Sequence, residues 1–407
     1  TERGRQTSHA AIIARSRGIP AVSGVRGVMR QVKTGDTIVV DGRDGHVIVK
    51  ADSEQLSAFR KLEREFFHLK DQLAENRHQP AVSADGESIQ LLANINTMAD
   101  AKAAQAMGAS GVGLYRTEFL YLTHPDVPDE EEQLADYRRM IEASPGQVVT
   151  IRTLDIGGDK TVPYLGHTHQ EANPFLGWRS IRLSFEHPEF FLTQIRAILR
   201  AAAEAEENGN RVQLMCPMIS TYEEMRRVRN MVRRAQRSLQ EEGKGFGSVP
   251  LGMMLEVPAA AVSIDSMLNI VDFVSIGSND LVQYLMAADR DNPKVNHLCQ
   301  PLSPPVLRVL RSVIRTCLQA SKPVTLCGEM AAMPSAFVLL YGMGLRSFSM
   351  SPAFVPSMKD LASHLTAQDA ERILQHVLGL RTHTQIRRYV HDRICELAPN
   401  LALLDTN

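Results

Sequence analysis

Polar side chains follow several short apolar runs in this sequence of 407 residues. These positions are Asn94, Arg116, Arg152, Asp155, Glu256, Asn279, Asp280, Cys327 and Glu329. The planar guanidinium group of arginine binds phosphate and carboxylate groups through paired hydrogen bonds. Glu256 and Asp280 offer hard oxygen atoms to Mg²⁺, which typically takes one or two protein carboxylates and completes its octahedron with substrate oxygens and water. The pattern therefore predicts a site that holds a small, strongly anionic ligand, partly through a divalent cation.

A purely structural interpretation is open for each of these residues taken alone. An arginine–aspartate pair at a strand end is more often a structural ion pair than a ligand site, and Glu256 before Pro258 could simply end a strand. The recurrence of charges at the same end of successive runs favours the ligand site. Arg179 and Arg290 fall later, in predicted helix or loop, where each could be a solvated or salt-bridging arginine. Arg290 lies close enough to Asp280 in the sequence to reach the same site.

Cys327 and His9 are candidate catalytic residues. A thiol at the position of Cys327 could donate a proton to a carbanion or enolate carbon, although small thiols are also common in protein cores. His9 is predicted to lie in the first turn of a helix that ends near Arg17, with Thr7 and Ser8 as N-cap residues. Unpaired N–H groups and the helix dipole there keep the imidazole neutral and stabilise a phosphate placed on it. His9 is therefore a candidate nucleophile, against the alternative of a structural or exposed histidine.

Between residues 83 and 395, short predicted strands alternate with helical patterns. The eight predicted strands are Gln90–Asn94, Gly111–Tyr115, Val148–Arg152, Val212–Met215, Gly252–Glu256, Phe273–Ile276, Val324–Cys327 and Ser347–Ser349. This alternation predicts a parallel sheet, and eight units predict an α/β fold of the closed (β/α)8 TIM-barrel type. An open doubly wound sheet is the alternative, but the glycine fingerprint expected after its first strand is absent from the sequence. In a barrel of this type, the catalytic residues lie at the C-terminal ends of the strands. The polar side chains that follow the predicted strands should therefore meet at one mouth of the barrel.

Two shorter regions precede the predicted barrel, which we place at residues 81–398, before a tail at 399–407. Residues 1–51 contain the helix from His9 and two predicted strands joined by a turn, and they resemble the C-terminal end of a domain. Residues 52–80 carry apolar residues at spacings of three and four, which is typical of one stripe on a long helix. A linker helix that packs one face against a neighbour is the favoured interpretation, and a short coiled coil is the alternative.

The composition excludes several classes of protein. Lysine and arginine number 45 against 46 aspartate and glutamate residues, and 44% of the residues are hydrophobic, which argues against a disordered chain, a nucleic-acid binder or a polybasic membrane binder. We find no apolar run of about 18 residues and no signal-peptide pattern, so no membrane partner is expected. The five cysteines form no CxxC pair, which argues against disulfides and zinc sites and favours a reducing, cytoplasmic setting.

Seven motifs, in order along the chain, resemble those of one protein family. They are Thr7-Ser8-His9-Ala-Ala-Ile-Ile-Ala-Arg-Ser, Gly113-Leu-Tyr-Arg-Thr-Glu-Phe-Leu-Tyr, Ile151-Arg-Thr-Leu-Asp-Ile-Gly-Gly-Asp-Lys, Gly177-Trp-Arg, Met254-Leu-Glu-Val-Pro, Ser275-Ile-Gly-Ser-Asn-Asp-Leu and Leu326-Cys-Gly-Glu-Met. Together they resemble phosphoenolpyruvate–protein phosphotransferase, enzyme I of the bacterial phosphotransferase system. The resemblance spans nearly the whole chain. It implies a phosphohistidine domain, here partial, and a phosphoenolpyruvate-binding (β/α)8 barrel that dimerises, in agreement with the strand count.

The resemblance also implies a role for each matching residue. His9 would accept the phosphoryl group, and Cys327 would protonate the enolate to release pyruvate. Glu256 and Asp280 would bind Mg²⁺. The residues that would hold phosphoenolpyruvate are Arg116, Arg152, Arg290, Asn279 and Asp280, with Arg179 as a further candidate. The implied partners are phosphoenolpyruvate, a small histidine-containing (HPr-like) phosphocarrier protein, and a second copy of the chain in a homodimer.

Two features differ from the pattern of the family. The family usually has two adjacent glycines before Thr-Ser-His, whereas here Gly4 is followed by Arg5, whose side chain could crowd the approaching phosphate. The sequence begins with Thr1 rather than with methionine, and the carrier-docking domain and the first part of the phosphohistidine domain would precede it. We therefore expect a fragment of a longer protein that binds phosphoenolpyruvate but transfers phosphoryl groups to a carrier poorly or not at all.

Related functions remain open as alternatives. Pyruvate phosphate dikinase and phosphoenolpyruvate synthase share a similar phosphohistidine domain and barrel, but they would add a nucleotide-grasp domain, and we find no glycine-rich phosphate loop. A nitrogen-related paralogue of enzyme I would act in regulation rather than in sugar uptake, usually with a sensory domain upstream. The sequence Ala-Ala-Ile-Ile-Ala-Arg-Ser-Arg-Gly after His9 slightly favours this branch.

Overall fold

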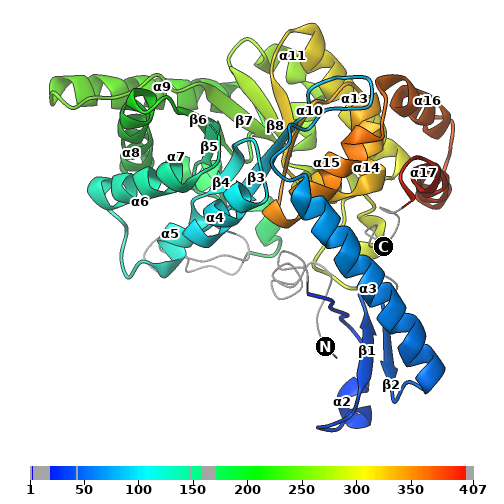
Figure 1. Ribbon diagram of the computed structural model, residues 1–407. Helices are drawn as coiled ribbons and strands as arrows, with labels where there is room; N and C mark the ends of the chain where they lie inside the picture. Colours follow the sequence, from blue (N-terminus) through cyan, green and yellow to red (C-terminus); the bar gives the residue numbers. More distant parts are fainter. Residues whose placement is uncertain (1, 3–18, 43–44, 147, 158–170, 400–407) are drawn as a thin grey trace.

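The computed structural model describes residues 2, 19–42, 45–146, 148–157 and 171–399, without the side chains of residues 66–72 and 74. A barrel with surrounding helices forms the main body, and a long helix connects it to a small N-terminal region (Figure 1). Among the described residues, no helix combines the length and the apolar character that crossing a membrane requires.

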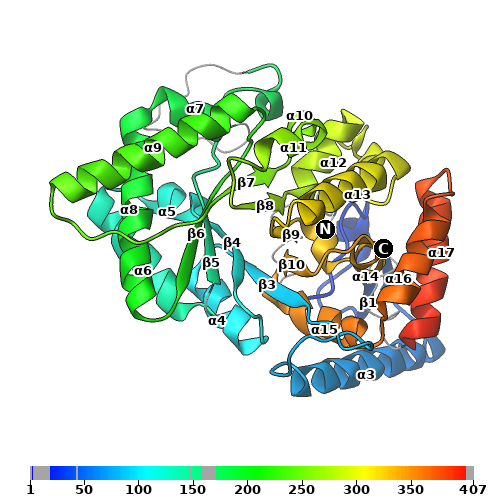
Figure 2. The ribbon, with the colours of Figure 1, turned by 90° about the horizontal axis from the view of Figure 1, so that it is seen from above.

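The barrel consists of eight parallel strands in a closed ring, as the sequence predicts. In ring order the strands are β10 (Ser347–Met350), β3 (Gln90–Ile95), β4 (Val112–Arg116), β5 (Val148–Arg152), β6 (Arg211–Cys216), β7 (Leu251–Leu255), β8 (Phe273–Ile276) and β9 (Val324–Leu326). Figure 2 shows this ring from above, with helices around its outside. The (β/α)8 prediction is confirmed, and each predicted strand end lies within one residue of the observed end.

Successive strand residues point alternately into two cores. A small cluster inside the barrel consists of Leu114, Met215, Met254, Phe273 and Cys327. Their chain neighbours Leu214 and Met253 belong instead to the large cluster that packs the strands against the helices. Because side chains alternate along a strand, every strand of a barrel contributes to both cores and reads as a continuous apolar run. This explains why the strands were recognisable in the sequence.

The helices that follow the strands cover the outside of the barrel. They are α4 (Met98–Ala106), α5 (Glu118–Thr123), α6 (Glu130–Ala143), α7 (Ile181–Glu186), α8 (Pro188–Glu207), α9 (Tyr222–Glu241), α10 (Pro258–Val262), α11 (Ile264–Met267), α12 (Ser278–Met286), α13 (Pro304–Gln319), α14 (Pro334–Gly342), α15 (Val355–Ser363), α16 (Ala367–Val377) and α17 (His383–Leu397). Short 3-10 turns include η2 (Pro174–Leu176), η3 (Asn296–Leu298), η4 (Glu329–Ala332) and η5 (Pro352–Phe354). Thr97, Asp129 and Thr221 begin α4, α6 and α9 with reciprocal capping boxes, which satisfy N–H groups that the helix itself leaves unpaired.

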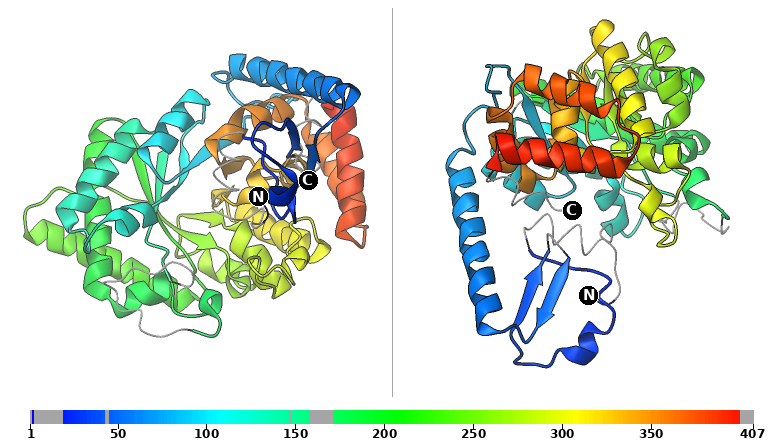
Figure 3. Two further views of the ribbon diagram at one scale, coloured as in Figure 1. Left: turned by 90° about the horizontal axis from the view of Figure 1, so that it is seen from below. Right: turned by 90° about the vertical axis from the view of Figure 1, so that its right-hand side faces the viewer.

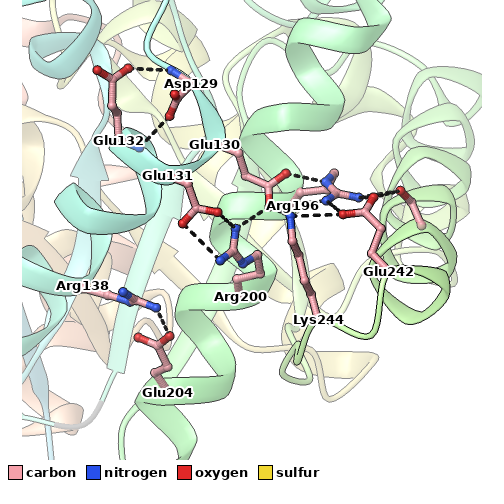
Figure 4. Close-up of polar contacts among 11 residues, drawn as sticks. Asp129, Glu130, Glu131, Glu132, Arg138, Arg196, Arg200, Glu204, Glu242 and Lys244 are labelled. Atoms are coloured by element: carbon pink, nitrogen blue, oxygen red, sulfur yellow. Dashed lines mark hydrogen bonds and ion pairs between the residues drawn. The ribbon is translucent and has the colours of Figure 1, made fainter.

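An ion-pair network fastens α6, α8 and the segment after α9 to one another (Figure 4). Glu130 at the start of α6 lies 2.5 Å from Arg196 and 2.6 Å from Arg200, both on α8. Arg196 also lies 2.7 Å from Glu242, and Lys244 lies 3.1 Å from the same carboxylate. Because the side chain of Arg196 is only 8% exposed, this network is partly shielded from solvent and holds the helix layer in register.

The N-terminal region contains α2 (Val28–Gln31) and an antiparallel pair, β1 (Ile38–Asp41) and β2 (His46–Val49). Helix α3 (Ser53–Glu75) runs from this pair to the barrel, where it contacts α15 (Figure 3, right). Asp52 and Gln55 exchange hydrogen bonds of 2.8 and 3.1 Å at the start of α3, which form a capping box. The helix ends at Glu75, before Pro80, and the carbonyl oxygen of Arg77 in the turn that follows accepts a hydrogen bond from Lys359 of α15.

Candidate active site at the mouth of the barrel

Arg152, the last residue of β5, occupies the centre of a buried cluster of charges. Its Nη2 donates to Oε1 of Glu118 at 2.9 Å, and its Nη1 lies 3.0 Å from Oδ2 of Asp155. Arg152, Glu118 and Asp155 are all at least nine-tenths buried. The strand end thus directs Arg152 into the mouth, and two carboxylates fix the orientation of its guanidinium group.

Arg179 reaches the same cluster from a segment 27 residues further along the chain. Its Nη2 donates to both oxygens of Asp155, at 2.9 and 3.1 Å, and to Oδ2 of Asp280 at 3.3 Å. A β-bridge to Gly157 anchors the backbone of Arg179, and Gly157 has φ +110° in a place where a Cβ atom would lie 2.5 Å from the Trp178 carbonyl oxygen. Ser180 follows with φ 58° and ψ −127°, a strained conformation for a residue with a side chain. This strain accompanies a close turn that points Arg179 inward.

Glu256 and Asp280 supply the acidic side of the mouth. Glu256 follows β7 and accepts a 2.6 Å hydrogen bond from the backbone N–H of Met218. Asp280, in the first turn of α12, lies 3.1 Å from Nη1 of Arg290 in addition to its bond with Arg179. Burial, followed by the nearby carboxylates of Asp280 and Asp155, raises the pKa of Glu256 from 4.5 to about 8, although two arginines of the mouth act in the opposite direction. Negative charge is therefore crowded at Glu256.

Arg116, Asn279 and Cys327 lie around this cluster. Arg116 ends β4 and donates to Asn96 at 3.4 Å, and burial together with the charge of Arg152 lowers its pKa. Asn279 accepts the N–H of Glu329 at 2.9 Å and so connects α12 with η4. Cys327, directly after β9, is 2% exposed, and burial raises the pKa of its thiol. Its Sγ lies 3.5 Å from the carbonyl oxygen of Ile276, so the thiol is held in its protonated form at the floor of the mouth.

The structure brings together most of the residues that the sequence selected. Ion pairs through Asp155 connect Arg152, Arg179, Asp280 and Arg290 in one chain. Glu256 lies near enough for the charges of this chain to influence its pKa. Arg116, Cys327 and Asn279 lie at its edge. Predicted residues His9 and Arg5 lie outside the described residues.

Two residues of the site were not predicted from the sequence, and a third was predicted without a role. Glu118 was not selected, although it follows Arg116 by two residues in the sequence and is only 4% exposed. Tyr284, one helical turn after Asp280, lies with its hydroxyl 3.4 Å from Arg179. Asp155 was noted at a strand end, but its position between two arginines was not anticipated. The short spacing between Arg116 at the strand end and Glu118 could have indicated Glu118 as a site residue. Nothing in the sequence around Tyr284 indicated that it belongs to the site.

The described residues contain no group of three or more histidine, cysteine, aspartate or glutamate side chains arranged to hold a metal ion. Glu256 and Asp280 form a smaller oxygen set, of the size that Mg²⁺ uses when substrate and water complete its shell. Gly277 leaves room beside Oε2 of Glu256, because a Cβ atom on that residue would lie 2.9 Å from this oxygen. The donor chemistry therefore fits a hard divalent cation.

A barrel with arginines and carboxylates at its mouth corresponds to a known enzyme class. The family model described as PEP-utilising enzyme, PEP-binding domain, matches residues 70–367. The model described as PEP-utilising enzyme, mobile domain, matches residues 1–45. The fold and the site thus define a phosphoenolpyruvate-utilising enzyme.

Curated relatives make the assignment more specific. Phosphoenolpyruvate-protein phosphotransferases from Bacillus sp. (strain S) and Geobacillus stearothermophilus are each 43% identical over 391 residues, which cover 96% of this chain and 67% of the relative. The enzyme of that name from Haemophilus influenzae is 38% identical over 401 residues, covering 98% of this chain and 69% of the relative. The chain belongs to the phosphoenolpyruvate-protein phosphotransferase family.

A solved structure of a citrate lyase from Burkholderia xenovorans LB400 also aligns with the chain. It covers 52% of this chain and 72% of its own, with 17% identity and a TM-score of 0.32. A likeness of this size says nothing about function.

Proposed function

We propose that the chain transfers the phosphoryl group of phosphoenolpyruvate to His9 with release of pyruvate, in a reaction whose final acceptor is a small histidine-containing, HPr-like phosphocarrier protein. The membership of the family supports this activity. The single observation that carries it is the shared carboxylate of Asp155, which holds Arg152 and Arg179 side by side at the mouth. Two adjacent guanidinium groups suit a ligand that carries both a phosphate and a carboxylate.

The arginines at the mouth would bind the substrate. Arg116, Arg152 and Arg290, with Arg179 as the fourth, would bind the phosphate and carboxylate of phosphoenolpyruvate, and Asn279 would donate to the same ligand. Asp155 and Glu118 orient the buried guanidinium groups before the substrate arrives. Because this orientation is fixed in the fold, little reorganisation is needed as charge moves during the reaction.

Glu256 and Asp280 would hold Mg²⁺. The crowded negative charge at Glu256 supports this role, since a divalent cation would relieve it. When bound, Mg²⁺ supplies positive charge next to the phosphate and the enolate oxygen of the substrate. The pairing of Asp280 with Arg179 and Arg290 holds that carboxylate at the mouth.

The proposed reaction has two parts. A ring nitrogen of neutral His9 attacks phosphorus in line, so that a P–N bond forms as the bond from phosphorus to the enol oxygen breaks. The arginines bind the negative charge left on the enolate. Cys327 then gives its thiol proton to the enolate carbon, and pyruvate forms. The buried, protonated thiol supports this assignment, because a thiolate could not donate.

The same proposal includes a swinging motion and an assembly. His9 and the barrel belong to separate regions joined by α3, so the phosphohistidine region (1–51) would move on this linker (52–80) to collect the phosphoryl group from the barrel (81–398) and to deliver it. We also propose that the chain works as a cytoplasmic homodimer through its barrel, in sugar uptake or nitrogen-related regulation.

Phosphoenolpyruvate labelled with ³²P tests the proposal directly. We expect the purified chain with Mg²⁺ to acquire acid-labile label on His9, and His9→Ala to acquire none. Arg152→Lys should slow labelling at least tenfold, because an ammonium group cannot replace the guanidinium fork between Glu118 and Asp155. Label that persists in His9→Ala, or a wild-type chain that takes no label, would refute the proposed acceptor.

A further inference from the structure

Asn94 is a strand-end residue of the mouth that the proposed reaction does not use. It lies near the end of β3, and its Nδ2 donates to the backbone carbonyl oxygen of Cys327 at 3.0 Å. Ser349 of β10 donates through its hydroxyl to Oδ1 of the same amide at 2.6 Å. Because a carbonyl oxygen can only accept, the contact with Cys327 fixes which end of the Asn94 amide faces each partner.

A shift in register between β3 and β4 accompanies this arrangement. The pairing with β4 moves by one residue between Ala93 and Asn94, which makes Gly113 the extra residue of β4. Such bulges are common next to active sites, where they redirect a side chain. A Cβ atom on Gly113 would lie 2.5 Å from the hydroxyl oxygen of Ser349. A side chain at Gly113 would therefore displace the hydroxyl that orients Asn94.

Asn94 and Ser349 both point into the barrel. Their chain neighbours belong instead to the core between the strands and the helices, and these neighbours are Ala93, Ile95, Phe348 and Met350. Side chains alternate along a strand, so Asn94 and Ser349 lie on the interior side, as Cys327 does. Ser349 is fully buried, and its bond to Asn94 is shielded from water.

Asn94 supplies one of three bonds that hold the segment carrying the thiol. Before the Cα atom of Cys327, the N–H of this residue donates to the carbonyl oxygen of Ile276 at 3.0 Å. Further along, the N–H of Glu329 donates to Oδ1 of Asn279 at 2.9 Å. The carbonyl oxygen of Cys327 lies between these two bonds, and Asn94 is its donor. Since the backbone is held on both sides of this Cα atom, the direction in which the thiol leaves the chain is fixed as well.

We propose that Asn94, held in turn by Ser349, is a positioning residue for the proton transfer from Cys327. The inference rests on the proposed function, in which the S–H bond of Cys327 breaks as a C–H bond forms at the enolate carbon, and the thiolate regains a proton from water. An enolate is planar, so a donor fixed on one side protonates one face. A misplacement of about 1 Å can cost about a hundredfold in rate. Asn94 thus controls the rate and the face of protonation but not the binding of the phosphate.

The face of protonation can be read from the product. Phosphoenolpyruvate with one deuterium and one tritium at known positions on C3 is mixed in ordinary water with Mg²⁺ and an excess of the intact chain. The pyruvate is trapped as lactate, and the configuration of its methyl group is determined. Protonation of one face gives a single configuration, which we expect of the wild type, whereas protonation of both faces gives a racemic methyl group.

Asn94→Ala should give a largely racemic methyl group and form pyruvate at least about tenfold more slowly. It should still transfer ³²P to His9, and its Kd for phosphoenolpyruvate should change less than about threefold, because Asn94 acts on the donor and not on the phosphate. A loss of stability alone would not change the face of protonation. The methyl configuration therefore separates positioning from a structural role.

Two further variants complete the comparison. Ser349→Ala keeps Asn94 but removes the hydroxyl that orients its amide, so we expect a partial loss of configuration, and this variant decides the matter if Asn94→Ala does not fold. Asn208→Ala is the matched control. It removes an amide that also donates to a backbone carbonyl at 3.0 Å, that of Glu204, but at the end of the outer helix α8. It should behave as the wild type does.

Alkylation of Cys327 by iodoacetamide gives a readout that needs no turnover. Asn94→Ala should raise its rate at least about fivefold, because a segment with one bond fewer opens more often, and Asn208→Ala should not. The inference is overturned if the wild-type methyl group is racemic, or if Asn94→Ala keeps the wild-type configuration or alkylation rate. A wild-type chain that takes no label on His9 would refute the proposed function instead, and the alkylation rates would still decide whether Asn94 holds Cys327.

Discussion

One nitrogen of Arg179 lies 2.9 and 3.1 Å from the two carboxylate oxygens of Asp155. The same carboxylate lies 3.0 Å from Arg152, so one buried acid orients two arginines that come from different parts of the chain. Because removal of one partner from a buried ion pair leaves an uncompensated charge, this arrangement depends on Asp155. The geometry of the mouth is therefore set by a residue that need not touch the substrate.

Asp155→Asn should lower kcat/KM for phosphoenolpyruvate by tenfold to a hundredfold, about 1.4 to 2.7 kcal/mol. The amide keeps the shape of the side chain but no longer holds both guanidinium groups by charge. Steady-state kinetics measure this, with Asp369→Asn as the matched control on the outer helix α16, where the carboxylate bonds to Thr366. An Asp155→Asn enzyme as active as the control would show that the shared carboxylate does not organise the site.

Cys327→Ala should slow pyruvate formation at least about a hundredfold, the scale of a lost general acid, while the Kd for phosphoenolpyruvate changes less than about threefold. The reason is that the buried thiol supplies a proton without contributing a charge to substrate binding. Pyruvate release and ligand binding are measured separately on the same preparation. Cys317→Ala, which removes a buried thiol from α13, is the control and should leave both values unchanged. Normal turnover in Cys327→Ala would remove the assigned role.

Glu256 should make the folded chain less stable as pH rises. Its pKa is raised from 4.5 to about 8, so between these values the folded state binds more protons than the unfolded state, and stability falls with increasing pH. Glu256→Gln removes the ionisation, while its amide oxygen can still accept the N–H of Met218. In a buffer without divalent cations, the variant should therefore gain stability over the wild type between pH 5 and pH 9, on the order of 3 kcal/mol. Urea unfolding at each pH measures the free energy of unfolding of the two proteins. A difference between variant and wild type that does not change with pH would contradict the raised pKa.

Glu130→Gln should lower the free energy of unfolding by about 2 kcal/mol, because Glu130 partners both Arg196 and Arg200 in a shielded position. The matched control is Glu204→Gln, which breaks the pair between Arg138 and Glu204, whose side chains are 42% and 41% exposed. An exposed ion pair contributes under about 1 kcal/mol to stability. Glu204→Gln should therefore lower the free energy of unfolding by less than Glu130→Gln does. Equal losses in the two variants would show that the network in Figure 4 adds nothing beyond surface pairing.

The barrel could be predicted from sequence because each strand is a short apolar run, which packs on both faces, followed by a polar residue. Arg152 and Glu256 were found in this way, since their positions depend only on the strands before them. Arg179 was harder to place, because its position depends on the long-range bridge to Gly157 and on the strained turn at Ser180.

Lys359 illustrates the same limit. It lies in an ordinary helical pattern, and only the folded chain shows that its ammonium group reaches the carbonyl oxygens of Arg77 and Gly108, more than 250 residues away in each case. Local patterns predict elements and strand-end chemistry. Contacts between distant segments, such as the ends of helices and buried charges, need the tertiary structure.

The central claim is that the arginines and acids at the barrel mouth surround one metal-bound substrate. A crystal structure of the chain with Mn²⁺ and oxalate, which resembles the enolate of pyruvate, tests it most directly. We expect Mn²⁺ coordinated by Glu256 and Asp280, with oxalate between the metal and the guanidinium groups of Arg152 and Arg179. A fully occupied ligand elsewhere, with no metal between the two acids, would contradict it.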